Sequence, residues 1–251
     1  MTDAAPTRPH ALALQKQTSS PSRQPLEVYH LSHDLRGPLN SILGFAELLL
    51  EEIEGPLNET QQADISAIYQ SAQNLLYLIN TVVDLSKLEA DRLTFDPKKI
   101  DLRGIIEAAL PNFTAAELGQ PELVNQVGPT LSSVWADRDR VAQMLKSLLK
   151  FAFKTTKKGP ITLTAWNEAT EVILCLEIAQ ASSALAEETD LFDLTVNVDS
   201  TGRTSLGRGG LELPLVRALA EKQGGRVWAE SQGDVLTLYT SLPAGETTTG
   251  L

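Results

Sequence analysis

The chain has 251 residues, of which 42% are hydrophobic, and 32 acidic against 21 basic residues give it a formal charge of -11. This length and composition suit one large or two modest globular domains. No stretch reaches the roughly 18 to 20 apolar residues that span a bilayer, since Glu47 interrupts the best one, which excludes an integral membrane protein. The start of the chain lacks the apolar segment of a secretion signal, so we expect a cytoplasmic protein.

The same composition leaves little material for metal or nucleic-acid sites. Cys175 is the only cysteine, and His10, His30 and His33 are the only histidines. Acidic side chains concentrate in residues 25–96, which carry twelve acids and three bases. Zinc sites need several Cys or His ligands, and phosphate backbones need clustered Lys and Arg. We therefore expect no metal, no nucleic-acid partner and no membrane contact.

Residues 1–24 have no sustained periodicity and are expected to form a flexible tail. Two helical stretches follow in residues 25–96, separated by Gly55 and Pro56. Their apolar residues recur at alternating spacings of three and four: Leu31, Leu35, Leu39, Ile42, Ala46, Leu49 and Ile53, then Ile65, Ile68, Ala72, Leu75, Ile79, Val82 and Leu85 or Ser86. This spacing is typical of a coiled-coil seam. One antiparallel hairpin cannot enclose two such stripes, so we expect a homodimer with a four-helix bundle.

After Asp96 the pattern changes to alternating helices and strands over residues 97–245. Residues 182–208 are expected to be rich in loops, and residues 246–251 to be a flexible C-terminus. The pattern predicts helices at 102–110, 137–153 and 211–222, and strands at 122–127, 161–167, 172–179, 227–231 and 235–242. The fold class is therefore a helical hairpin followed by an α/β sandwich domain.

His33 is the strongest candidate for a reactive residue. It lies off the apolar seam, in line with polar residues and glycines, so its ring is expected to face solvent. On position alone, an exposed histidine without function is the alternative. Asp34 could accept a proton from one ring nitrogen and leave the other as a nucleophile. Arg36 could contact phosphate oxygens, and Pro38 lies inside the helix, where it costs roughly 3 kcal/mol.

The segment around His33 resembles the H-box of bacterial two-component sensor histidine kinases. Residues 32–42 read Ser-His-Asp-Leu-Arg-Gly-Pro-Leu-Asn-Ser-Ile, where the family usually has Ser-His-Glu-Leu-Arg-Thr-Pro-Leu. Residues 84–90 resemble the usual end of the family's second helix. The resemblance implies a dimerisation and phosphotransfer hairpin, with His33 as phosphoacceptor and Asp34 as the adjacent acid. Gly37 stands where the family often has Thr or Asn to orient water, so phosphatase activity by that route is not expected.

The second domain resembles the family's ATP-binding domain in layout, with a different set of residues at the metal position. The family's Asn box aligns with residues 147–155 and places Phe151 at the position of a magnesium ligand. Magnesium takes oxygen ligands, and a phenyl ring offers none. The resemblance therefore predicts a domain that has lost this ligand.

The other two nucleotide motifs also depart from the family. Gln180 replaces the carboxylate that reads adenine, and both glycines of that motif have gained side chains. Gly209 and Gly210 remain in the glycine-rich motif, but Glu212 adds a negative charge close to where phosphates would lie. We therefore expect no bound cofactor, with ATP and Mg²⁺ used only under the alternative of a divergent active kinase.

A basic stripe follows the helix predicted at residues 137–153. It consists of Lys146, Lys150, Lys154 and Lys157 or Lys158, opposite Val141, Leu145, Leu148 and Ala152. Such a stripe is usually a solvated face, and the alternative is contact with an acidic partner.

Three functions remain open. The sequence favours a dimeric histidine phosphotransferase of a phosphorelay, in which His33 exchanges a phosphoryl group with receiver-domain aspartates of response regulators. An upstream hybrid kinase would be a further partner. The first alternative is a cytoplasmic histidine kinase that phosphorylates His33 from ATP. The second is a non-catalytic regulator or scaffold of kinases or receivers.

Overall fold

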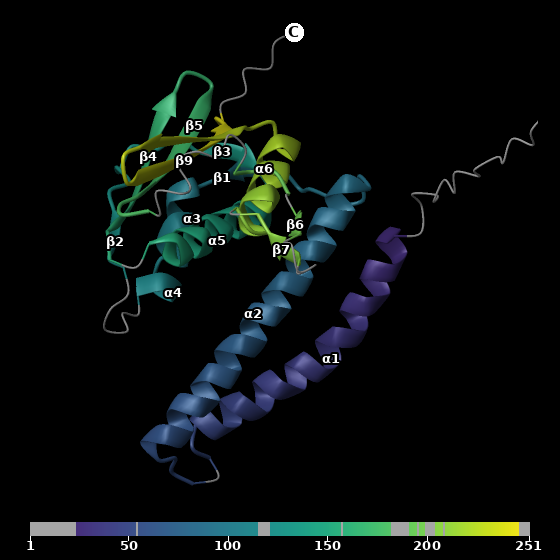
Figure 1. The fold of residues 1–251 in the computed structure, drawn as a ribbon. Helices are drawn as coiled ribbons and strands as arrows, with labels where there is room; N and C mark the ends of the chain where they lie inside the picture. The colour runs from purple at the N-terminus through teal and green to yellow at the C-terminus, as the bar shows by residue number, and fades with distance from the viewer. Residues whose placement is uncertain are drawn as a thin grey trace, which may run out of the picture.

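The computed structural model of the chain describes residues 24–53, 55–114, 121–156, 158–181, 191–194, 196–198, 204–207 and 209–245. They form a long helical hairpin and, at one end of it, an α/β domain (Figure 1). The fold class predicted from the sequence is therefore confirmed. The two predicted flexible termini lie outside the described residues, except for Gln24.

The hairpin consists of the antiparallel helices α1 (Gln24–Leu50) and α2 (Glu59–Glu89) (Figure 1). A capping box opens α2: the Asn58 side chain accepts a hydrogen bond from the Gln61 amide at 2.9 Å, and the Gln61 side chain accepts one from the Asn58 amide at 3.0 Å. The box satisfies two amide groups at the start of the helix. It fixes the start of α2 just after the predicted glycine–proline break.

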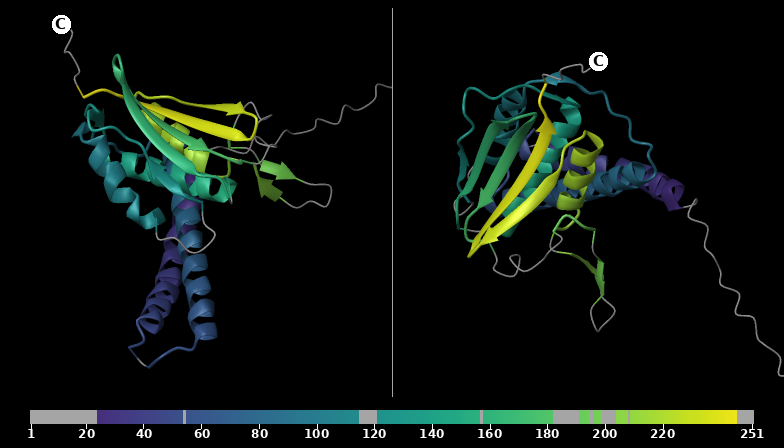
Figure 2. Two further views of the ribbon diagram at one scale, coloured as in Figure 1. Left: turned by 90° about the vertical axis from the view of Figure 1, so that its left-hand side faces the viewer. Right: turned by 90° about the horizontal axis from the view of Figure 1, so that it is seen from above.

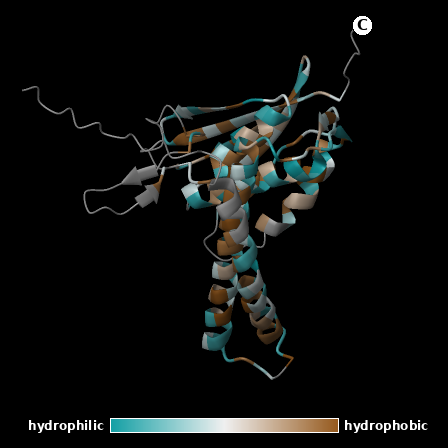
Figure 3. Cartoon of the chain, turned by 90° about the vertical axis from the view of Figure 1, so that its right-hand side faces the viewer, coloured by the Kyte–Doolittle hydropathy of each residue, from teal (hydrophilic) through white to brown (hydrophobic). Residues whose placement is uncertain are grey.

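One copy of the hairpin encloses only part of its apolar seam. Leu39 and Ala46 of α1 are buried, whereas Phe45 is 69% exposed. Hydrophobic and hydrophilic positions alternate along both helices (Figure 3). The other open apolar side chains of the hairpin include Leu31, Leu35, Ile42, Leu48, Leu49, Ile53, Ile68, Leu75, Leu78 and Val82. No helix in the described part of the chain is both long and apolar enough to cross a bilayer.

The second domain is a two-layer sandwich of a five-stranded sheet with helices on one face (Figure 2). The strands lie in the order β2-β4-β5-β9-β8; β2 runs parallel to β4, and the other neighbours are antiparallel. The strands are β2 (Leu123–Asn125), β4 (Ile161–Glu168), β5 (Glu171–Ile178), β8 (Val227–Gln232) and β9 (Val235–Pro243), and the covering helices are α3 (Leu102–Ala109), α5 (Arg138–Thr155) and α6 (Glu212–Lys222). Each of these elements lies close to its predicted range.

Several short elements were not predicted. They are the antiparallel pair β1 (Lys98–Ile100) and β3 (Val134–Ala136), the single turn α4 (Pro111–Thr114), and the antiparallel pair β6 (Val196–Val198) and β7 (Thr204–Leu206). Residues 182–208 were expected to be rich in loops, and β6 and β7 are a short strand pair within that range. Three residues are too few to carry a periodic pattern, and these strands are defined by the partner with which they pair.

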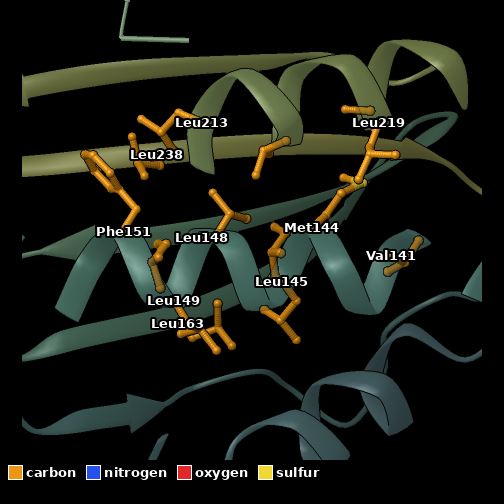
Figure 4. Close-up of a cluster of buried hydrophobic side chains, with 14 of the residues drawn as sticks. Val141, Met144, Leu145, Leu148, Leu149, Phe151, Leu163, Leu213, Leu219 and Leu238 are labelled. Carbon is orange, nitrogen blue, oxygen red and sulfur yellow. The ribbon is translucent and has the colours of Figure 1, made fainter. Parts of the chain in front are cut away.

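Helix α5 forms the centre of the domain core, packed on the sheet and beside α6 (Figure 4). Its buried face includes Met144, Leu145, Leu148 and Leu149, each at most 3% exposed. Asp137 caps the helix: one carboxylate oxygen accepts hydrogen bonds from the amides of Asp139 at 3.0 Å and Arg140 at 3.2 Å. The other oxygen accepts the amide of Asp96 at 2.9 Å.

Candidate active site

His33 lies on the open surface of α1, as its position relative to the seam predicted. Its side chain is 79% exposed and that of Asp34 is 80% exposed. His33 Nδ1 and Asp34 Oδ1 are 3.5 Å apart, at the outer limit of a hydrogen bond. A proton on Nδ1 shared with this carboxylate leaves Nε2 unprotonated and able to act as a nucleophile. The pair is thus accessible to a large partner.

Arg36, one turn further along α1, contacts the second helix. Its Nε and Nη2 donate to Asn80 Oδ1 of α2 at 3.2 and 2.7 Å. These hydrogen bonds hold the two helices together one turn from His33. The predicted phosphate contact of Arg36 stays a prediction, and Asn80 is a residue that sequence reasoning missed, since 44 positions separate the partners.

Gly37 sits in open space. No atom of the described residues lies within 4 Å of where a Cβ on Gly37 would be, apart from its chain neighbours and the backbone of its own helix. Packing within one chain therefore does not require a glycine here. The expected lack of phosphatase activity by the water-orienting route stays a prediction.

The side chain at the magnesium-ligand position belongs to the core. Phe151 is 2% exposed and points in among core residues that include Leu213 and Leu238 (Figure 4). Its ring therefore contributes to the hydrophobic stabilisation of the domain. It offers no oxygen to a cation.

Backbone conformation and close packing explain why the glycine-rich motif has glycine at positions 209 and 210. Gly210 has a φ of +61°, in the left-handed region that favours glycine. A Cβ on Gly209 would overlap the carbonyl oxygen of Leu191. Both glycines are therefore needed for packing and conformation, whether or not a phosphate binds.

Glu212 places a carboxylate at the start of α6. It is 8% exposed, and its Oε2 accepts a hydrogen bond from the Leu211 amide at 3.1 Å. A negative charge at this end of a helix interacts favourably with the helix dipole, as a phosphate would. The position expected for phosphates thus already holds an anionic side chain.

The described residues therefore do not fit a nucleotide carried by Mg²⁺. A buried phenyl ring stands at the metal-ligand position, and a buried carboxylate stands where phosphates would lie. Gln180 is exposed, and the rest of its motif lies outside the described residues, except for Ala181, whose amide donates to the Asp234 carbonyl at 2.8 Å.

A set of contacts joins the hairpin to α5 and α6. Tyr77 Oη of α2 and Ser147 Oγ of α5 are hydrogen-bonded at 2.9 Å, and Lys150 Nζ lies 3.7 Å from the centre of the Tyr77 ring. Gln143 Nε2 donates to Asp84 Oδ2 at 2.7 Å. The basic stripe was expected to be solvated, and this is wrong for Lys150, which the hairpin partly covers. Long-range contacts of this kind leave no periodic signal in a sequence.

Beside these contacts lies a cleft of about 810 Å³ between α2 and the second domain. Its lining includes Gln73 and Asn74 of α2, Ala108 of α3, and Arg138 and Lys146 of α5. The cleft shows that the domain touches the hairpin at separate points rather than over one continuous surface.

Comparison with known protein families finds both domains. Residues 26–91 match the His Kinase A (phospho-acceptor) domain, and residues 136–247 match the family described as histidine kinase-, DNA gyrase B- and HSP90-like ATPase. The first match contains His33, and the second contains Phe151 and Glu212.

Individual relatives agree with these matches. The circadian input-output histidine kinase CikA of Synechococcus elongatus is 31% identical over 91% of this chain and 31% of its own length. Full-length ShkA in complex with AMPPNP is 25% identical, with a TM-score of 0.65 over 88% of this chain and 46% of that chain. Histidine kinase ThkA in complex with response regulator protein TrrA shares the fold, with 20% identity and a TM-score of 0.55 over 88% of this chain and 64% of that chain. The chain spans about a third of the length of the first curated relatives it matches.

Proposed function

The chain belongs to the two-component sensor histidine kinases through both of its domains, and from this premise we propose that His33 accepts a phosphoryl group and passes it to the aspartate of a receiver domain. The observation that carries the proposal is the exposed His33–Asp34 pair within the matched phospho-acceptor region. A nucleophile that serves large partners must be open to solvent, and this one is.

The proposed chemistry uses the two ring nitrogens differently. Nε2 of the neutral ring attacks the phosphorus of the donor, a P–N bond forms, and the bond to the donor's leaving oxygen breaks with its electron pair. The carboxylate of Asp34 stabilises the proton on Nδ1 as the ring gains positive charge. In the forward step a carboxylate oxygen of the receiver attacks the same phosphorus, and the electron pair of the P–N bond returns to Nε2.

The identity of the donor separates two candidate functions. The relatives found by comparison are histidine kinases, and they favour a kinase that phosphorylates its own histidine. They give no support to the phosphotransferase that the sequence analysis ranked first. We keep the phosphotransferase as the second candidate on one observation, the buried Phe151 and Glu212 at the nucleotide positions.

We also propose that the chain acts as a dimer and docks response regulators. The apolar side chains that one hairpin leaves open would be covered by a second hairpin, and their burial would drive association. The complex of ThkA with TrrA supports a receiver as the partner. Because residues 25–96 carry an excess of nine acids, the docking face of that receiver should be neutral or basic.

One assay tests the function and separates the candidates. The purified chain is incubated with radiolabelled ATP and Mg²⁺ and, separately, with phosphorylated receiver domains from several response regulators. His33→Ala should abolish labelling of the chain, by more than about a hundredfold, because the nucleophile is removed. His30→Ala, one turn earlier on α1, is the matched control and should label normally.

The pattern of labelling decides the outcome. Labelling from ATP that His33→Ala abolishes establishes the kinase. Labelling only from a phosphorylated receiver establishes the phosphotransferase. Labelling that persists in His33→Ala, or none from ATP and the whole receiver set, rejects phosphoryl transfer through His33 and leaves the scaffold.

A further inference from the structure

Cationic side chains of α5 and α6 meet acidic side chains of the hairpin region within the same chain. Helix α5 carries five cations and one acid, and the hairpin region that it faces carries nine more acids than bases. Arg140 lies 3.7 Å from Asp84 near the end of α2, and Lys222 of α6 forms an ion pair with Asp91. Opposite charges thus meet across the junction of the two domains, at two points.

Two turns before Asp84 on α2, Tyr77 reaches the buried side of α5. Its hydroxyl is hydrogen-bonded at 2.9 Å to Ser147, which is fully buried. Ser147 is the first residue of the segment that aligns with the family's Asn box, one helical turn before Phe151. A side chain of the hairpin therefore contacts the face of α5 that a nucleotide would need.

The Tyr77 ring is held from a second side. Lys150 Nζ lies 3.7 Å from the ring centre, a distance at which the ring attracts a cation. Burial and the nearby Lys146 lower the pKa of Lys150, and the Glu212 carboxylate acts in the opposite sense. Burial also raises the pKa of Tyr77, which keeps its hydroxyl protonated at neutral pH. The Tyr77 ring is thus partly buried between α2 and α5, at the edge of the cleft that it helps to line.

Glu212 completes the cluster from α6. Its carboxylate raises the pKa of Tyr77, so its negative charge acts on the hydroxyl as well as on Lys150. The place of a Cβ on Gly210 would overlap Glu212 Oε2 and lies 3.7 Å from Lys154 Nζ. The Glu212 carboxylate of α6 and the Lys154 ammonium of α5 therefore both lie beside Gly210, in the motif that the family uses for phosphates.

We propose that the α5–α6 face is a docking surface for the chain's own hairpin, anchored by Tyr77, and that this docking excludes a nucleotide from the same face. The hydroxyl of Tyr77 binds Ser147, and its ring binds Lys150. The domain stays against α2 as long as these contacts hold. The inference needs neither phosphorylation of His33 nor a particular phosphoryl donor.

The test measures docking directly. Gln73 of α2 and Ala108 of α3 line the same cleft from the two domains, and neither belongs to the Tyr77 cluster. Both are replaced by cysteine in a Cys175→Ser background, and the rate of intrachain cross-linking by a short bis-maleimide is measured. Denaturing gels separate intrachain from interchain products in the dimer.

Four variants are compared in this background. Tyr77→Ala removes hydrogen bond and ring together and should slow cross-linking about tenfold or more. Tyr77→Phe and Ser147→Ala each remove only the hydrogen bond and should slow it about two- to tenfold, by similar factors. Tyr69→Ala, two turns earlier on α2, is the matched control and should leave the rate unchanged. Circular dichroism verifies that each variant is folded.

A second measurement tests exclusion of a nucleotide. Binding of Mg·ATP is measured by equilibrium dialysis for the native sequence and for Tyr77→Ala. If the native sequence binds Mg·ATP and its cross-linking rate is the same with and without the nucleotide, docking does not exclude the nucleotide. Weaker or absent binding to the native sequence than to Tyr77→Ala agrees with exclusion by docking. No binding to either would overturn it, because the site itself would then be unable to hold the nucleotide.

Cross-linking of Tyr77→Ala at the native rate would overturn the docking role whatever the nucleotide result. All rates are measured again in His33→Ala, where they should not change. Failure of phosphoryl transfer through His33 is therefore distinguishable from failure of the docking inference.

Discussion

The H-box of α1 and the α5–α6 face of the second domain contain motif positions of one family, yet they are physical opposites. His33 and Asp34 are about four-fifths exposed and contact mainly each other. Phe151 and Glu212 are buried, and neighbours within the chain surround them. An exposed motif keeps its side chains available to a partner, whereas a buried one uses them for packing and internal charge pairing. Likeness in layout and likeness in chemistry therefore have to be judged residue by residue.

The largest effect that sharpens this contrast is expected at Phe151. Phe151→Ala should lower the free energy of unfolding of the domain by about 3–5 kcal/mol, because a buried ring is lost and a cavity remains. Phe153→Ala is the control: that ring is only half-buried, stacked on Phe113 at 5.7 Å, and should cost less. Urea denaturation followed by circular dichroism measures both. A loss below about 1 kcal/mol for Phe151→Ala would contradict the core role of the ring.

A smaller effect is expected at Asp137, where burial acts to raise the carboxyl pKa but the amides of Asp96, Arg140 and Asp139 outweigh it and hold the pKa below its usual value. Asp137→Ala should cost about 1 kcal/mol at neutral pH, as for other helix caps. Because the native pKa is lowered, this contribution is present above the ordinary carboxyl pKa and is lost as the pH falls through the native value. Thermal unfolding at pH 7 and in acid measures it.

The neighbouring Asp139 serves as the control for that cap. It is exposed and its side chain makes no hydrogen bond among those found in the described residues, so Asp139→Ala should change stability less than Asp137→Ala. An equal loss for both variants at neutral pH would assign the effect to the helix dipole rather than to the cap.

The smallest effect on stability is expected at Gly37, in the exposed H-box of α1. Gly37→Ala should raise the free energy of unfolding by about 0.5–1 kcal/mol, because alanine favours a helix interior and the described residues leave space for its Cβ. Gly44→Ala, at the same kind of open position on α1, should behave alike. Chemical denaturation of the purified protein measures both. Destabilisation by Gly37→Ala but not by Gly44→Ala would show that a second chain covers Gly37. The H-box would then not be an exposed motif at this residue.

The regular elements of this fold were predictable from the sequence. The two hairpin helices, α5 with its Asp137 cap, and the long strands β4, β5, β8 and β9 have the periodicity or the capping residues that define them locally. The pairs β1–β3 and β6–β7 do not, because three residues are too few to show a period, and β1 also depends on a partner far along the chain. The exposure of His33 followed from helical phase alone.

The candidate site was predictable where its residues are neighbours in sequence. His33 and Asp34 are adjacent, so one segment contained the pair. The contacts of Arg36 with Asn80 and of Tyr77 with Ser147 join residues 44 and 70 positions apart, and only the folded chain brings them together. The lysine stripe was identified, but the partner of Lys150 was not, because the hairpin that covers it lies in another domain.

The two oxygens of Asp137 have a mechanical consequence. One accepts amides at the start of α5, and the other accepts the amide of Asp96, in the segment that leaves the hairpin. Helix α5 has 18 residues and is about 27 Å long, and it forms the centre of the domain core. This carboxylate therefore ties the segment that leaves the hairpin to the first turn of a long, rigid helix. A displacement of that segment would be transmitted directly to the start of α5.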